Sequence, residues 1–93
     1  MAVLTGEQIR AQLSNLPGWE LHGNAIRKQY TFGGFTEAIR FVNRVAEAAE
    51  RADHHPDILV QYNRVTLTLS THSEGGVTQK DLDLARQIEE LAG

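Results

Sequence analysis

The stretch Ile58–Thr71, ILVQYNRVTLTLST, decides which fold the chain can adopt. Over residues 65–70 apolar side chains alternate with hydroxyl side chains, which is the pattern of a strand with one face in a core. A shorter apolar run precedes it, and Tyr62-Asn63 separates the two runs by the two residues of a tight hairpin turn. Pairing across that turn places Ile58 opposite Leu67, so the stretch predicts a β-hairpin with one apolar face.

A second hairpin is predicted earlier in the chain, around Gly23-Asn24. This pair suits the positive φ that a two-residue turn requires. Pairing across it sets Leu21 opposite Ile26 and Glu20 opposite Arg27. Apolar then meets apolar and acid meets base, so the side chains support this register.

Three amphipathic helices are predicted around the hairpins. The first begins at a capping box, Thr5-Gly6-Glu7-Gln8, and ends near Leu16-Pro17-Gly18. The second runs from Phe35 to about Asp53, where Pro56 stops it. The third follows a second capping-box spacing, Thr78-Gln79-Lys80-Asp81. The predicted buried stripes are Ile9, Leu13 and Leu16, then Ala38, Ile39, Val42, Val45, Ala46 and Ala49, and finally Leu82, Ala85, Ile88 and Leu91 or Ala92.

The resulting element order is α-β-β-α-β-β-α. It predicts an α+β fold, with residues 1–93 forming a single domain. Its four-stranded antiparallel sheet has the helices packed on one face. A length of 93 residues suits one domain, and 41% hydrophobic with 23% charged residues is ordinary for a globular protein.

Composition also excludes several classes of function. The absence of cysteine removes disulfides, zinc-thiolate sites and thiol nucleophiles. A net charge of −3 with scattered basic residues argues against a nucleic-acid partner. No apolar run approaches the length of a membrane span, and no signal peptide is recognisable, so we expect a soluble, cytoplasmic domain without a membrane partner.

Two of the four histidines, His54 and His55, are adjacent and follow the second helix. If the register of the second hairpin continues past Asp57, it brings a third histidine to the same end of the sheet. The extended register sets His55 level with Ser70, His54 with Thr71 and Asp53 with His72. Because it crosses a proline and a helix end, it predicts proximity and no particular pairing. We therefore expect three imidazoles to converge, although each also has a simpler explanation as a solvated polar residue at an element end. Asp81 likewise fits its capping position without any further role.

A metal site is one interpretation of this cluster. Three histidines with Asp53, Asp57 and Asp81 nearby have the ligand types of a His-and-carboxylate centre. However, no two histidines have the spacing that places them on one helix face, and adjacent side chains diverge. We therefore expect no metal and no other cofactor. His22 abuts the first turn and is expected to be solvent exposed.

Acid–base catalysis is the other interpretation. Imidazole titrates near neutrality, so one histidine can give a proton while another takes one. The sequence has neither a recognisable nucleophile triad nor a glycine-rich phosphate loop. Such a site could perform dehydration, tautomerisation or isomerisation.

The residues at this end of the chain resemble a known signature. Glu50-x-x-x-His54-His55-Pro56, then Tyr62, His72 and Asp81 at their spacings, is similar to the motif of the pterin-4a-carbinolamine dehydratases. Other segments also resemble this family: Leu16-Pro17-Gly18-Trp19, Tyr62-Asn63-Arg64-Val65, Leu69-Ser70-Thr71-His72 and Asp81-Leu82. One departure is Ile58, where many members carry an aromatic residue.

The resemblance implies an α+β hydro-lyase that removes water from 4a-hydroxytetrahydropterin and regenerates a tetrahydrobiopterin-type cofactor without a cofactor of its own. It implies His54, His72, His55 and Asp81 as catalytic residues, with His55 mainly binding and positioning the pterin and Glu50 as the acid at the start of the motif. We further expect Glu50, Asp53, Ser70 and Thr71 to bind the substrate. It also implies a homodimer or homotetramer. A non-catalytic interaction or dimerisation module is the alternative that this family suggests.

Overall fold

The computed structural model describes residues 3–92 and has the predicted α+β architecture in the predicted order. Residues 1, 2 and 93 of the predicted domain lie outside the described part. In chain order the elements are α1 (Gly6–Leu13), β1 (Glu20–His22), β2 (Ala25–Thr31), α2 (Phe35–Ala52), β3 (Asp57–Gln61), β4 (Arg64–Leu69), a short 3-10 turn η1 (His72–Glu74) and α3 (Gln79–Ala92).

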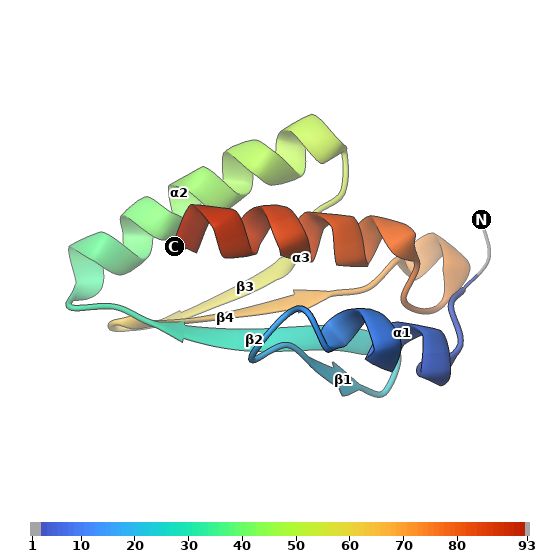
Figure 1. Ribbon diagram of the computed structural model, residues 1–93. Helices are drawn as coiled ribbons and strands as arrows, with labels where there is room; N and C mark the ends of the chain where they lie inside the picture. The colour runs from blue at the N-terminus through green and yellow to red at the C-terminus, as the bar shows by residue number, and fades with distance from the viewer. Residues whose placement is uncertain (1–2, 93) are drawn as a thin grey trace.

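The four strands form one antiparallel sheet with the order β1-β2-β4-β3. Both predicted hairpin registers are confirmed, with Leu21 opposite Ile26 and Ile58 opposite Leu67. The two hairpins join through their inner strands, because β2 pairs with β4 along six residue pairs from Ile26–Leu69 to Thr31–Arg64. Helices α2 and α3 lie side by side over one face of this sheet, and α1 packs near β1 (Figure 1).

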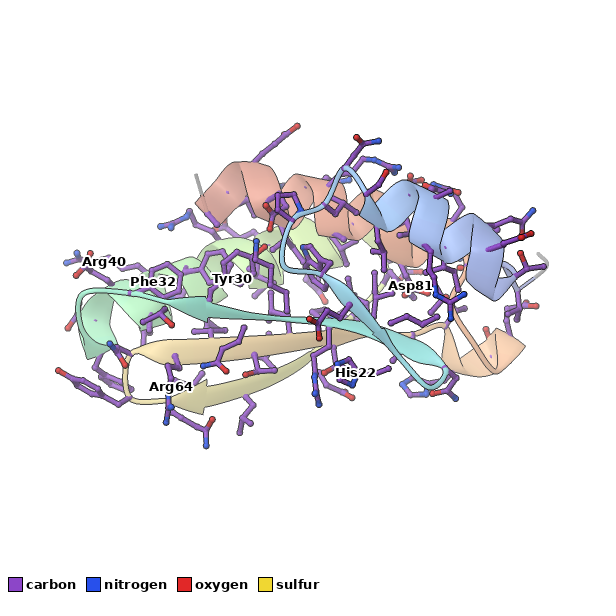
Figure 2. The ribbon with its side chains drawn as sticks, turned by 60° about the horizontal axis from the view of Figure 1, so that its bottom comes forward. His22, Tyr30, Phe32, Arg40, Arg64 and Asp81 are labelled. Atoms are coloured by element: carbon purple, nitrogen blue, oxygen red, sulfur yellow. The ribbon has the colours of Figure 1, made fainter. Side chains whose placement is uncertain are left out.

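The buried side of α2 differs from the predicted stripe. Ala46 is exposed, whereas Phe41 is fully buried although the prediction left it out. Tyr30 and Phe32 lie on the side of the sheet that faces the helices (Figure 2), and the centre of the Phe41 ring lies 4.9 Å from the centre of each of their rings. These aromatic contacts favour the orientation of α2 in which Phe41 faces the sheet. Helical periodicity alone does not predict this orientation. The residues of α2 that are buried are Ala38, Phe41, Val45, Ala48 and Ala49.

The first and last helices, α1 and α3, follow their predictions more closely. The capping box at Thr5 is present, and Leu82, Ala85 and Ile88 of α3 are buried together with Leu84. The predicted end of α1 at Leu16 was wrong, because the helix ends at Leu13. Leu16 is still buried, but it reaches the core from a turn in which its N–H donates to the Leu13 carbonyl.

Gly18 is needed where this turn enters β1. Its φ is +87°, and a Cβ there would come within 2.8 Å of Lys28 Cε. We expect Gly18→Ala to destabilise the protein by about 2–3 kcal/mol, since left-handed strain and a displaced lysine add together. Gly23→Ala is the matched control, with φ +59° and no atom near the new methyl group, and should cost about 1 kcal/mol. Urea unfolding of both variants checks this, and equal losses would show that the lysine contact is unimportant.

A polar cluster on the core side ties β2 to α3. Glu89 accepts hydrogen bonds from Lys28 Nζ at 2.6 Å, from Trp19 Nε1 at 3.2 Å and from the Tyr30 hydroxyl. Burial tends to raise the pKa of Glu89, but the hydrogen bonds from Lys28, Tyr30 and Trp19 outweigh it and hold the pKa below its ordinary value of 4.5. Burial and the neighbouring carboxylate together raise the pKa of Tyr30.

The lowered pKa of Glu89 predicts a contribution to stability that is lost in acid. A carboxyl whose pKa is lower in the folded chain stabilises the fold above about pH 4.5, and the contribution is lost as the pH falls through the folded pKa. We expect Glu89→Gln to lower the melting temperature at pH 7 by about 4–8 °C, the effect of roughly 1 kcal/mol. Below pH 4.5 the difference from the native protein should shrink. Thermal melts from pH 7 to pH 3 check this, and a constant difference would contradict it.

Candidate active site

The end of α2 directs the first two histidines. Asp53 takes a left-handed conformation with φ 51°, its N–H donates to the Glu50 carbonyl, and the N–H of His54 donates back to the Ala49 carbonyl at 3.1 Å. This arrangement terminates the helix and turns the chain sharply beneath it. Pro56 then disfavours helical geometry at His55, the residue before it. His54 consequently lies against the start of α3.

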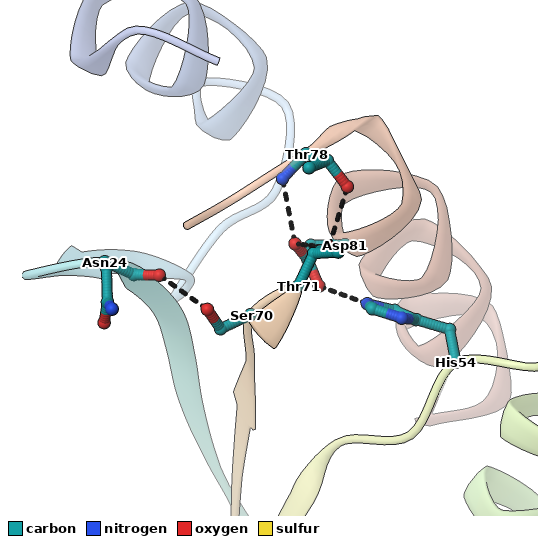
Figure 3. A network of polar contacts seen from close by, with 6 residues as sticks. All are labelled: Asn24, His54, Ser70, Thr71, Thr78 and Asp81. Atoms are coloured by element: carbon teal, nitrogen blue, oxygen red, sulfur yellow. Dashed lines mark hydrogen bonds and ion pairs between the residues drawn. The ribbon is translucent and has the colours of Figure 1, made fainter. Parts of the chain in front are cut away.

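Asp81 is the centre of the polar network at this position. Its side chain is fully buried, and its Oδ1 contacts His54 Nε2 (Figure 3). Its Oδ2 accepts from the Thr78 N–H and from the Thr71 hydroxyl, both at 2.9 Å. A buried carboxylate is tolerated only when it is well paired, and Asp81 has three donors.

The hydrogen-bond network assigns the protons of this pair. An ionised Asp81 can only accept hydrogen bonds, so the nitrogen of His54 that faces its Oδ1 carries a hydrogen. A neutral His54 therefore has its hydrogen on Nε2 and its free lone pair on Nδ1. Only 11% of the His54 side chain is exposed, so the ring is held by packing as well as by Asp81.

The second capping box is only half formed. The Thr78 N–H bonds the Asp81 side chain as predicted, but the Thr78 hydroxyl lies 2.8 Å from the Thr71 hydroxyl instead of capping the helix. Because the Thr71 hydrogen goes to Asp81, Thr78 must donate to Thr71. Thr71 is thus a link in the network behind His54.

Three histidines border one open hollow of about 280 Å³ at this end of the sheet. His54 and His55 reach it from the end of α2, and His72 reaches it from the start of η1. The hollow is lined by Asp53, His54, His55, Ser70, Thr71, His72, Ser73 and Lys80. The residues that were predicted to converge therefore do so.

The extended register itself does not form, and only the proximity that it predicted is present. The β3–β4 ladder stops at Asp57 opposite Thr68, so His55 does not pair with Ser70, nor His54 with Thr71, nor Asp53 with His72. Pro56 has no N–H for such a ladder. Thr71 instead forms an isolated bridge with Gly76.

Other predicted residues lie at or behind the rim. Glu50 and Asp81 contact His55 and His54 respectively but do not line the hollow, and Ile58 does not line it either. The Ser70 hydroxyl donates to the Asn24 carbonyl at 2.8 Å, which joins the first hairpin turn to the site. His22 lies on the opposite, open side of the sheet and contacts Glu20 (Figure 2).

Sequence reasoning missed three participants. Lys80 and Ser73 line the hollow, and Thr78 belongs to the network behind it. Their only signal was proximity to Asp81 and His72 along the chain. Within residues 3–92, no three His, Asp or Glu side chains lie close enough together to hold a metal ion. No helix in this part of the chain is long and apolar enough to cross a membrane.

Comparison with known proteins identifies the family. The family model described as Pterin 4 alpha carbinolamine dehydratase matches residues 2–91. The chain belongs to this family. A Thermomicrobium roseum protein, named provisionally as a pterin-4-alpha-carbinolamine dehydratase, is 53% identical over 92 residues, which are 99% of each chain. Membership confirms the resemblance and makes the chain a hydro-lyase of the pterin carbinolamine dehydratase class.

Solved structures agree with this assignment. The crystal structure of a Brucella melitensis protein, described as a transcriptional coactivator/pterin dehydratase, matches with a TM-score of 0.93 and 41% identity over 98% of this chain and 99% of that one. A pterin dehydratase-like protein, described as a RuBisCO assembly factor in the alpha-carboxysome, matches with a TM-score of 0.66 and 22% identity over 81% of this chain and 87% of that one. The second likeness concerns the fold alone.

Proposed function

We propose that residues 1–93 act as one dehydratase domain that converts 4a-hydroxytetrahydropterin to quinonoid dihydropterin by histidine acid–base catalysis. The supporting observation is the shared hollow of three imidazoles, one of them fixed by a buried carboxylate. The reaction removes a hydroxyl group from C4a and a proton from N5, and the N5 lone pair assists departure of the hydroxyl. In the chemical step, the protein therefore needs to provide only proton transfer.

His54 is proposed as the base and His72 as the acid. When His54 takes the N5 proton at Nδ1, the Asp81 carboxylate behind it stabilises the resulting imidazolium. His72 gives a proton to the leaving hydroxyl group, which departs as water. The two proton transfers balance, and exchange with solvent restores both rings.

The remaining lining residues are proposed to hold the pterin. His55 and Asp53 border the hollow with groups that can bond the donors of a pterin ring. The Ser70 oxygen keeps acceptor capacity, although its hydrogen is engaged with Asn24. The Thr71 hydroxyl donates to Asp81, so we assign Thr71 a supporting role for His54 beside any substrate contact.

Stopped-flow absorbance of 4a-hydroxytetrahydropterin decay tests this function. The native protein should accelerate the decay well above the buffer rate, and a rate equal to that of buffer would leave the interaction-module alternative. Elemental analysis after mild chelation should find no stoichiometric zinc or iron. Stoichiometric metal together with metal-dependent rates would overturn cofactor-free chemistry.

We also propose a cytoplasmic homodimer or homotetramer that takes a small-molecule pterin rather than nucleic acid and recycles a tetrahydrobiopterin-type cofactor. Large apolar side chains support self-association, since Leu59 on the edge strand β3 is 53% exposed and Phe35 on α2 is 52% exposed. Sedimentation should give two or four times the 10.3 kDa mass. A monomer at micromolar concentration would contradict this.

A further inference from the structure

Both adjacent histidines of the site present the same ring atom to a carboxylate. His54 Nε2 contacts the buried Asp81, and His55 Nε2 lies 2.6 Å from Glu50 Oε2. We propose that Glu50 is a positioning residue that accepts the Nε2 hydrogen of His55 and thereby presents its Nδ1 lone pair to the pterin. This inference rests on the proposed role of His55 in holding the substrate.

The end of α2 explains why the two side chains meet. Glu50 occupies the last turn of α2, and the left-handed Asp53 folds the chain back so that His55 returns beside it. His55 lines the hollow, whereas Glu50 does not. A substrate in the hollow is therefore contacted by the ring, and Glu50 acts through that ring. This differs from the sequence-based prediction that Glu50 binds substrate itself.

Exposure sets the size of the expected effect. The side chains of His55 and Glu50 are 57% and 77% exposed, against 11% and 0% for His54 and Asp81. Water competes for an exposed pair, so the Glu50 contact is worth much less than the buried one. We expect loss of Glu50 to weaken substrate binding about two- to fivefold and to leave the fold intact.

Steady-state kinetics of Glu50→Ala and Glu50→Gln test the proposal. The alanine variant should raise KM two- to fivefold with little change in kcat, because the substrate and the transition state lose the same contact. The glutamine variant should restore most of the affinity, since its amide oxygen can accept the same hydrogen bond. Glu47→Ala, an exposed acid one turn earlier on α2, is the matched control and should behave as native.

A double-mutant cycle separates positioning from direct contact. In a His55→Ala background, Glu50→Ala should have no further effect on KM. An undiminished effect there, or no effect in the native background, would overturn the proposal.

The ring tautomer provides a readout that needs no turnover. At about pH 8, where a typical imidazole is neutral, the ring ¹⁵N shifts of His55 should report the Nε2–H form in the native protein and a mixture with Nδ1–H in Glu50→Ala. Identical shifts in the two proteins would overturn the assignment. If the native protein proved inactive, the proposed function would fail while this measurement still decided the role of Glu50.

Discussion

Replacing His54 with glutamine and His72 with alanine together is expected to lower the acceleration of carbinolamine decay by about 10²–10⁴-fold, the usual contribution of general acid–base catalysis. Neither substitute can exchange protons near neutrality. The glutamine amide can still donate to Asp81, so the buried carboxylate keeps a partner. His72 is exposed and makes no side-chain hydrogen bond within the described part of the chain, so its loss should not disturb the fold. Stopped-flow absorbance measures the rate, and circular dichroism verifies folding.

His22→Ala is the control for this experiment. It removes the same kind of side chain from the open face of the sheet, where His22 contacts Glu20 and Arg27, and it should leave the rate unchanged. Alanine at position 54 would be a poorer test, because it would leave Asp81 Oδ1 buried without a donor and confuse instability with lost catalysis. A folded double variant with the native rate would eliminate both histidines from the mechanism.

Asp81→Ala is expected to destabilise the protein by about 3–5 kcal/mol, the usual effect of removing one partner from a buried charged pair. The substitution leaves the Thr78 N–H, the Thr71 hydroxyl and the His54 ring without their acceptor. In a domain of this size the melting temperature should fall by more than about 10 °C. Calorimetry measures the loss. Asp83→Asn, on the exposed side of the same helix, is the control and should stay near native stability.

Asp81→Asn separates the two roles of this side chain. The amide keeps the shape and one acceptor oxygen, so stability should fall less than in the alanine variant. Its NH₂ group would face His54 and favour the tautomer with hydrogen on Nδ1, which cannot accept the N5 proton. We expect the rate acceleration to fall by at least about 10²-fold. Native activity in this variant would show that Asp81 serves only to cap the helix and has no role in catalysis.

Local patterns predicted the elements because their causes are local. Alternation around Tyr62-Asn63 and Gly23-Asn24 determines both hairpin registers, and Pro56 limits how far α2 can extend, although the helix already ends at Ala52 before the left-handed Asp53. The order of the strands was not predicted, because it depends on how β2 meets β4. The orientation of α2 with Phe41 facing the sheet was also missed, since it depends on the rings of Tyr30 in β2 and of Phe32 directly after it.

The location of the site could be predicted from the sequence, but its hydrogen-bond network could not. The spacing of His54, His55 and His72 indicated that they meet, and they do border one hollow. The hydroxyl network from Thr78 through Thr71 to Asp81 could not be predicted, because it forms only when η1 brings the end of β4 beside the start of α3. Which hydrogen bond a side chain makes is decided by such tertiary neighbours.

The central pairing of β2 with β4 has a consequence for folding. Each hairpin alone would leave its apolar face in water, and a two-stranded ribbon is marginal by itself. Neither hairpin therefore gains much stability before β2 pairs with β4. We expect all-or-none folding, at a rate limited by this pairing of strands that are distant in the sequence. A nascent chain in which β4 has not yet emerged from the ribosome would therefore form no stable folded intermediate.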